Sequence, residues 1–239
     1  MQERKDLDGT CLVTKLTNFD YSVCKEITAE TTEKGRLYKT PDGSFPSVTT
    51  ILGKTANNIW LQRWKDKVGE EEATRVSKAA TYRGEIVHKY LERYWDGSNS
   101  WATDILNEEI TTQKMITNLI QVTQKGVTNV WAQEIPVWSK HLRYAGRVDM
   151  FGEWNKIPAV IDFKTSKKKK QIKDIKDYFI QCTAYAYAHN EIFKTNLQKI
   201  VVLITVENAD VQVFESQTLP FIPELKYRIN QYEKLQISL

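Results

Sequence analysis

The 239-residue chain has 41% hydrophobic and 27% charged residues, a balance typical of a folded globular protein. This composition excludes disordered, collagen-like and coiled-coil chains. With 34 Lys and Arg against 30 Asp and Glu, the net charge is only +4, so any attraction to nucleic acid has to come from local basic patches. The length favours a single domain over residues 1–239, large enough to bury a core without disulfides or a structural metal.

The three cysteines, Cys11, Cys24 and Cys182, are widely spaced and include no C-x-x-C pair. This spacing argues against a disulfide framework, a zinc site and an iron–sulfur cluster, and it favours a reducing compartment. The first residues lack the apolar core of a signal peptide, and no apolar run reaches the length of a membrane span. We therefore expect a soluble, unexported protein in a bacterial or phage-infected host cytoplasm rather than in an organelle.

The N-terminal half of the sequence predicts an irregular segment followed by helices. Residues 1–45 are expected to form irregular structure with a hairpin or two and to carry no chemistry. A helical region follows over residues 46–125, where Ser47 has the side chain of a helix N-cap. Within this region, apolar residues at helical spacing predict helices over roughly 70–94 and 103–125.

From residue 126 onwards the hydrophobic period changes from helical to alternating. The first three predicted strands form an antiparallel sheet, and the whole order of elements is that of an α/β (α+β) core over residues 126–239. The predicted elements are strands over 127–138, 142–153 and 159–165, a helix over 172–193, strands over 199–206 and 211–216, and a closing helix after Pro220 or Pro223.

Two acidic residues face each other in this sheet if the turn is centred between Asn155 and Lys156. In that register Asp149 lies directly opposite Asp162, where side chains are about 4.5–5.5 Å apart at Cβ and like charges destabilise the sheet. Lys164 follows two residues later and shares the same face of the strand. Two carboxylates and an ammonium therefore converge on one patch.

Hard oxygen ligands held close by a rigid sheet suit Mg²⁺ or Mn²⁺, as one ion or two. A lysine beside such an ion can orient a nucleophile or neutralise charge on a phosphoryl group, so the patch predicts phosphodiester hydrolysis. The alternative interpretation is an exposed charge cluster on a surface hairpin, which a D-x-K tripeptide taken alone favours.

The surrounding residues favour a functional site. Gln181 and Tyr185 are four residues apart on one face of the predicted helix after the acids. His88 lies four residues after Gly84 on an earlier helix, where a glycine would allow a close approach of that helix to another backbone. Each residue alone has a structural explanation, but together they indicate a site.

These residues resemble the RecB-like branch of the PD-(D/E)XK nuclease superfamily. The pattern appears as His88, Gly146-Arg-Val-Asp149, Asp162-Phe-Lys164 and Gln181-Cys-Thr-Ala-Tyr185. The resemblance implies a restriction-endonuclease-like core, with a central mixed sheet flanked by helices. It also implies metal ligation by His88, Asp149, Asp162 and the Phe163 backbone carbonyl, a catalytic Lys164, and Gln181 and Tyr185 in the active site. Glu134 is a further candidate, because it resembles an acid often found upstream of the G-x-x-D motif.

The segments Pro46-Ser-Val-Thr49 and Leu61-Gln-Arg-Trp-Lys65 resemble the mitochondrial genome maintenance exonucleases and their phage relatives within that branch. This resemblance implies degradation of single-stranded DNA from free ends. The chain lacks the four cysteines that bind an iron–sulfur cluster in other relatives, so no such cluster is expected.

Seven residues are candidates for binding DNA, within the helical region and after the catalytic strand. The hydroxyls and free N–H groups at a helix start suit a phosphate, an aromatic ring can stack on an unpaired base, and a basic run can contact the backbone. The candidates are Ser47, Thr49, Arg63, Trp64, Arg83, Lys167 and Lys168. For the tryptophan and the lysines, a core position and a solvated face are the alternatives.

The sequence thus predicts a metal-dependent DNA exonuclease that acts on single-stranded DNA in replication, repair or recombination, with replication or recombination proteins as partners. A structure-specific endonuclease or a duplex-resecting exonuclease of the same fold is an alternative within the enzyme class. A non-catalytic nucleic-acid-binding recombination partner is the alternative of another class. Retention of opposed carboxylates argues against it, because they cost stability unless they bind an ion.

Overall fold

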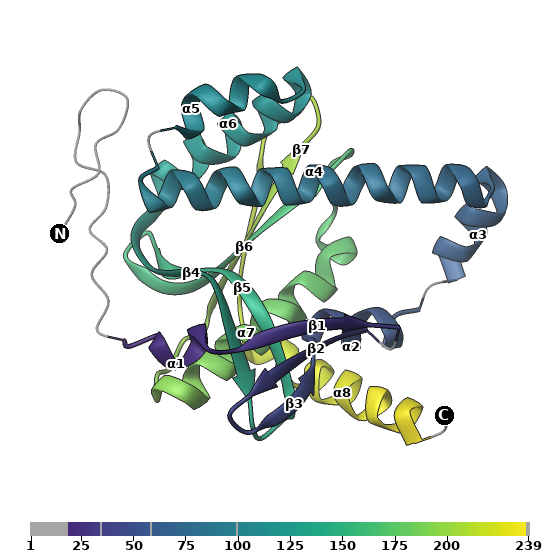
Figure 1. Cartoon of the computed structure of the whole chain (residues 1–239), viewed down its shortest axis with the longest axis vertical. Coiled ribbons are helices and arrows are strands. Elements are labelled where there is room, and N and C mark those ends of the chain that lie inside the picture. The colour runs from purple at the N-terminus through teal and green to yellow at the C-terminus, as the bar shows by residue number, and fades with distance from the viewer. Residues whose placement is uncertain (1–18, 34, 58, 99, 238–239) are drawn as a thin grey trace.

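The structure, a computed structural model, describes residues 19–33, 35–57, 59–98 and 100–237. Residues 1–18, part of the segment expected to be irregular, lie outside these ranges. The remainder of that segment forms a short helix and an antiparallel sheet of order β1-β2-β3 (Figure 1). These elements are α1 (Ser22–Lys25), β1 (Thr28–Thr32), β2 (Gly35–Thr40) and β3 (Gly43–Pro46). Tyr38 and Phe45 are buried in the main core, so this sheet covers the body of the protein instead of forming a loose hairpin.

A five-stranded sheet of order β4-β5-β6-β7-β8 runs through the molecule (Figure 1). Its strands are β4 (Val127–Ser139), β5 (Tyr144–Trp154), β6 (Ile157–Ser166), β7 (Lys199–Val206) and β8 (Gln212–Gln217). All neighbours are antiparallel except β6 and β7, which are parallel, so the predicted mixed sheet is confirmed. Residues 200–206 of β7 are all buried and nearly all apolar, as expected of a strand that is covered on both faces.

Helices cover both faces of this sheet. On one face α4 and α6 pack against the strands, and on the other α7 does so, with α2 and α8 beside it (Figure 1). Successive residues of β6 show the two faces, because Val160 belongs to the apolar cluster under α7 and Ile161 to the cluster under α4 and α6. The helices are α2 (Val48–Thr55), α3 (Ile59–Val68), α4 (Glu70–Asp96), α5 (Trp101–Asp104), α6 (Ile110–Gly126), α7 (Lys176–Phe193) and α8 (Ile222–Ile237).

The long helix α4 carries one side of the site. Its acidic first turn suits the positive end of the helix dipole, and Gly97 closes the other end in the left-handed conformation by donating its N–H to the Arg93 and Tyr94 carbonyls. The second half packs on the sheet, whereas α3 and the start of α4 extend beyond it (Figure 1). No helix in the described part of the chain is both long enough and apolar enough to cross a membrane.

Two predicted helices begin later than the sequence indicated. α6 begins at Ile110 rather than near residue 103, because the chain first forms α5 and a 3-10 turn, Ile105–Asn107. The Gln113 side chain donates hydrogen bonds to two backbone carbonyls, of Leu106 and Glu108, at the break between that turn and α6. α7 likewise begins at Lys176, after a 3-10 turn at Ile172–Ile175 in which two side chains cap each other's backbone N–H groups.

The turn between β5 and β6 sets the register on which the site depends. Residues 155 and 156 have positive φ angles, 52° and 65°, as a two-residue hairpin turn of this kind requires. The pairs then run up to Met150 with Ile161. This register is the predicted one, and the next opposed residues in it are Asp149 and Asp162.

Candidate active site

Asp149 lies where β5 loses its backbone pairing to β6. The pairs between these strands stop at Met150 and Ile161, one step before the two acids. In place of a ladder hydrogen bond, the Phe163 N–H donates to the Asp149 carboxylate, with 2.7 Å between N and Oδ2. The strands separate at this point, and a side-chain carboxylate takes over the role of a backbone carbonyl.

Glu134 faces Asp149 from the other neighbouring strand. The flanking β4–β5 pairs are Gln133 with Met150 and Ile135 with Val148. Glu134 is thus left opposite Asp149, and its φ of 46° lies in the left-handed region, which is strained for a non-glycine residue in a strand. Three adjacent strands therefore bring an acid to the same level of the sheet, because Asp162 follows on β6.

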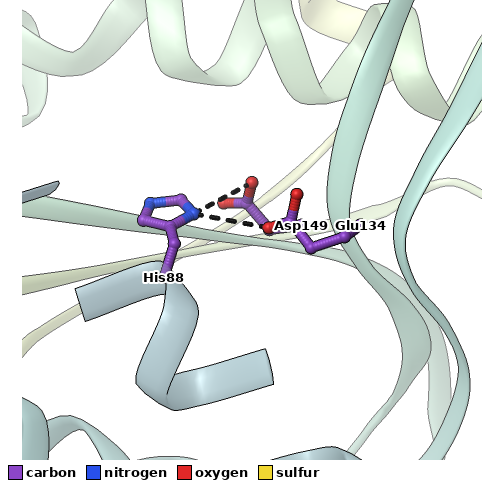
Figure 2. Close-up of side chains that lie close together, drawn as sticks. All are labelled: His88, Glu134 and Asp149. Carbon is purple, nitrogen blue, oxygen red and sulfur yellow. Dashed lines mark ion pairs between the residues drawn. The ribbon is translucent and has the colours of Figure 1, made fainter. Parts of the chain in front are cut away.

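His88 reaches this level from α4 (Figure 2). Its Nδ1 lies 3.4 Å from Asp149 Oδ1 and 3.6 Å from Glu134 Oε1. Its Nε2 lies 2.9 Å from the Phe163 carbonyl oxygen, and donation of a proton to that carbonyl turns Nδ1 towards the carboxylates. The ligand atoms of the three side chains lie within 4.8 Å of one another. Two carboxylates and one imidazole nitrogen at this spacing fit a divalent cation such as Mg²⁺ or Mn²⁺.

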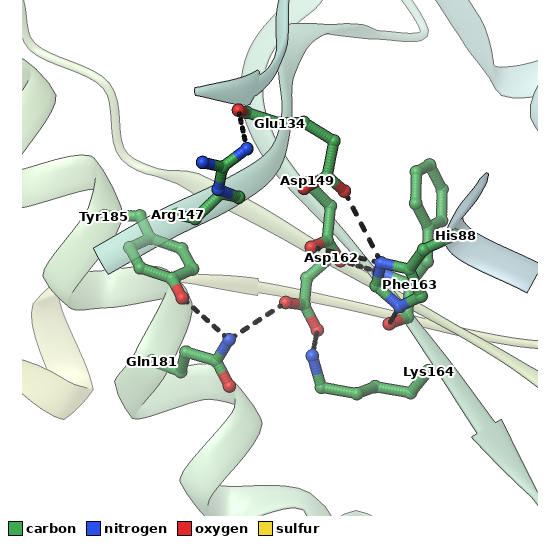
Figure 3. Close-up of polar contacts among 9 residues, drawn as sticks. All are labelled: His88, Glu134, Arg147, Asp149, Asp162, Phe163, Lys164, Gln181 and Tyr185. Atoms are coloured by element: carbon green, nitrogen blue, oxygen red, sulfur yellow. Dashed lines mark hydrogen bonds and ion pairs between the residues drawn. The ribbon is translucent and has the colours of Figure 1, made fainter. Parts of the chain in front are cut away.

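Asp162 is completely buried and points to Lys164 and Gln181 instead of His88 (Figure 3). The Lys164 Nζ lies 2.5 Å from one carboxylate oxygen, and the Gln181 amide donates to the other at 3.4 Å. The sequence predicted Asp162 and the Phe163 carbonyl as metal ligands. In the structure Glu134 joins His88 and Asp149, and the carbonyl accepts a hydrogen bond from His88, so these two ligand roles stay predictions.

The charges of His88 and Asp149 support each other. Burial disfavours a charged imidazole, but the Asp149 carboxylate, with help from Glu134, outweighs burial and raises the His88 pKa to about 10. Burial would likewise raise the pKa of the Asp149 carboxyl. The positive charges of His88 and Lys164 and the Phe163 N–H outweigh it and lower that pKa below its ordinary value.

Asp162 bears the repulsion between the opposed carboxylates. Burial, with the Asp149 charge, raises its pKa to about 6, although Lys164 acts in the opposite direction. Burial would lower the pKa of Lys164, but Asp162 and Asp149 outweigh it and raise that pKa, so the ammonium is charged at neutral pH. The cost expected of two facing acids therefore falls on Asp162, beside a permanent cation.

The glycine of the G-x-x-D motif and the tyrosine of the Q-x-x-x-Y motif are in direct contact. A Cβ at Gly146 would lie 2.6 Å from Cε1 of the buried Tyr185 ring. The Tyr185 hydroxyl accepts a hydrogen bond from Gln181 at 3.0 Å, so glycine makes room for the support of Asp162. Gly84 differs, because a Cβ there would lie 3.8 Å from the Thr165 hydroxyl, an ordinary contact, and the predicted need for glycine is wrong.

Two residues of the site were missed in the sequence. Arg147, within the G-x-x-D motif, donates from Nη1 to the Glu134 carbonyl at 3.0 Å (Figure 3). Tyr178 packs its ring 5.3 Å from the Lys164 ammonium, at cation–π distance. The signals for them were position alone, since Arg147 precedes Asp149 by two residues on one strand and Tyr178 lies on α7 beside Gln181.

An open cavity of about 490 Å³ lies over the cluster. Ser47 and Thr49 line it together with Lys164, so these two candidates for phosphate binding face the site. Ser47 also caps α2, as predicted, by accepting the Thr50 N–H.

The other candidates for DNA binding do not line this cavity. They are Arg63, Trp64, Arg83, Lys167 and Lys168. Arg63 and both lysines are exposed, Trp64 is half-buried, and Arg83 lies 3.8 Å from Glu207 at the end of β7. A role in DNA binding stays a prediction for all seven.

Residues 59–232 match the PD-(D/E)XK nuclease superfamily. This match spans most of the chain, so the chain belongs to that superfamily, and both the predicted fold and the nuclease class are confirmed. Members of the class use divalent metals, in keeping with the His88, Glu134 and Asp149 cluster.

The chain is similar to mitochondrial genome maintenance exonuclease 1 of three vertebrates. It is 30% identical to the Xenopus tropicalis protein over 188 residues, 71% of this chain and 50% of the relative. The mouse protein is 30% identical over 175 residues, 70% of this chain and 51% of the relative, and the human protein 29% over 182 residues, 70% and 50%. The chain spans about half the length of the curated relatives it matches. A crystal structure from Eubacterium rectale superposes with a TM-score of 0.45 and 11% identity over 65% of this chain and 68% of that one, too partial a likeness to carry an argument.

These relatives also correct the expected compartment. The sequence favoured a bacterial or phage-infected host cytoplasm over an organelle. The three relatives are mitochondrial by name, so that expectation is wrong.

We expect the metal-depleted protein to lose stability as the pH rises from about 7 to about 9.5, because of His88. A histidine whose folded pKa is raised from 6.5 to about 10 stabilises fully below the lower value, and this contribution is lost as the pH approaches the upper one. Urea unfolding in EDTA should therefore show the parent losing about 1–3 kcal/mol more than His88→Asn over this range. Parallel pH profiles for the two proteins would show that His88 is not held as a cation by the carboxylates.

Gly146→Ala should lower the free energy of unfolding by about 1–3 kcal/mol, because the added methyl meets the Tyr185 ring in a closely packed core. Gly84→Ala is the matched control and should stay neutral or add up to about 1 kcal/mol, since alanine favours the helix and meets only an ordinary contact. Equal effects of the two substitutions in urea titrations would contradict the proposed contact between the two motifs.

Proposed function

We propose that the chain is a Mg²⁺- or Mn²⁺-dependent DNA exonuclease that degrades single-stranded DNA from free ends. The observation that carries this proposal is the group formed by His88, Glu134 and Asp149 in one cavity with Lys164. A chain of the PD-(D/E)XK superfamily with this donor set has what phosphodiester hydrolysis needs: a place for a hard cation and a lysine charged at neutral pH.

The residues of the cavity divide into three tasks. His88, Glu134 and Asp149 would hold the cation, with Asp162 as a further ligand proposed from the sequence. A bound divalent cation supplies Lewis-acid stabilisation of charge on the phosphoryl oxygens. Lys164 donates its protons towards the same charge, and Gln181 holds the Asp162 carboxylate that orients Lys164.

Three features support single-stranded DNA and free ends as the substrate. The similar vertebrate proteins are exonucleases by name, and genome maintenance implies DNA. α3 and the first half of α4 extend beyond the sheet next to the cavity, which offers a helical surface along which a flexible strand can lie (Figure 1). The exposed lysines 167–169 follow the strand that carries Asp162 and Lys164, where they can contact phosphates. The names of the relatives further support a role in maintaining an organellar genome, with DNA repair or recombination as narrower settings.

Asp162→Asn and Lys164→Ala should each reduce cleavage of end-labelled single-stranded DNA by about 100-fold or more, because each removes a charge aimed at the reacting phosphate. Lys226→Ala, on the exposed side of α8, is the control and should cleave like the parent. Circular dichroism should show all three variants folded. Activity within about tenfold of the parent for either site variant would overturn the assignment of the site, and would favour the non-catalytic binding protein.

Linear single-stranded DNA should be degraded faster than a closed single-stranded circle or a blunt duplex, since bases stacked in a duplex cannot lie against protein side chains. The rate should fall as salt rises, because phosphate contacts release counterions. Gel assays with the three substrates at equal nucleotide concentration test this. Equal rates on circle and line would replace the exonuclease with the endonuclease, and equal rates on blunt duplex would indicate a resecting enzyme.

A further inference from the structure

Strand β4 contains one residue, Glu134, whose backbone does not fit a strand. Its φ of 46° costs free energy for a side chain with a Cβ, and its neighbours on both sides are regularly paired with β5. Such strain persists only where surrounding contacts impose it. The contact that does so must act on the backbone of Glu134.

Arg147 provides this contact. It lies on β5 opposite Pro136, and its Nη1 donates to the Glu134 carbonyl at 3.0 Å (Figure 3). A carbonyl that leaves the ladder needs another donor, and a guanidinium supplies a strong, charge-assisted one. On the other side of the same residue, the Glu134 carboxylate reaches within 3.6 Å of His88 Nδ1.

We propose that Arg147 is a positioning residue that holds the Glu134 backbone in its left-handed conformation and so places the Glu134 carboxylate beside His88 and Asp149. This inference rests on the proposed function, because the carboxylate is placed there to bind a divalent cation. Arg147 itself acts through Glu134 and touches no ligand of the site.

The alternative role for Arg147 is a purely electrostatic one, since it lines the cavity and could attract a phosphate. The two roles predict opposite signs for metal binding without DNA. Removal of a positive charge close to a cation site strengthens cation binding if charge alone matters. Removal of a positioning residue weakens it, because the Glu134 carboxylate is no longer held at the site.

The test is calorimetric titration of the full chain with Mn²⁺ in the absence of DNA. We expect Arg147→Gln to raise the Kd for Mn²⁺ at least tenfold, and Arg147→Lys, which can still donate to a carbonyl, to recover part of that loss. Lys89→Ala is the matched control, since Lys89 lines the same cavity from α4 and its loss removes an equal charge. It should leave the affinity unchanged or improve it.

A double-mutant cycle with Glu134→Gln separates positioning from a general loss of structure. In the parent, Glu134→Gln should weaken Mn²⁺ binding strongly, and in the Arg147→Gln background it should add little, because the carboxylate is already displaced. Unchanged or tighter Mn²⁺ binding by Arg147→Gln, or additive effects in the cycle, would overturn the inference while leaving the proposed function standing. A parent protein that binds no Mn²⁺ would overturn both.

Discussion

The site depends on a break in the pairing of β5 at Asp149. On one side the ladder to β6 stops and the Asp149 carboxylate accepts the Phe163 N–H, and on the other Glu134 leaves the extended conformation. A continuous sheet would bind its backbone groups to one another and present only side chains on its two faces. Because the strands separate here, a carboxylate enters the plane of the sheet and a histidine from α4 can bind a backbone carbonyl of β6.

The charges at this break are balanced closely but not completely. His88 and Asp149 stabilise each other, whereas Asp162 is buried against Asp149 and relies on Lys164 and Gln181. The apolar clusters on both faces of the sheet hold these groups in place, since β6 and β7 are buried on both sides. A rigid, incompletely neutralised group of oxygens is what a divalent cation requires, and binding it adds stability that the metal-depleted protein lacks.

Much of this arrangement can be read from the sequence. Alternating and helical periods predicted every strand of the main sheet, and the turn at Asn155 and Lys156 predicted the register that opposes Asp149 and Asp162. The predicted starts of α6 and α7 were wrong because local side-chain caps, which the period does not show, break these helices. The G-x-x-D and Q-x-x-x-Y motifs are visible as patterns, but their contact through Gly146 and Tyr185 is visible only in space. No sequence signal indicates that a glutamate in a strand adopts positive φ, so the place of Glu134 in the cluster and the role of Arg147 depend on the structure.

The central claim is that His88, Glu134 and Asp149 together hold a divalent cation at the break in the sheet. A crystal structure of the chain with Mn²⁺, with data collected at the manganese absorption edge, tests it most directly. The claim predicts an anomalous peak about 2.0–2.4 Å from His88 Nδ1 and from one oxygen of each of the two carboxylates. A peak bonded to Asp162 and the Phe163 carbonyl but not to Glu134, or no peak in the cavity, would contradict it.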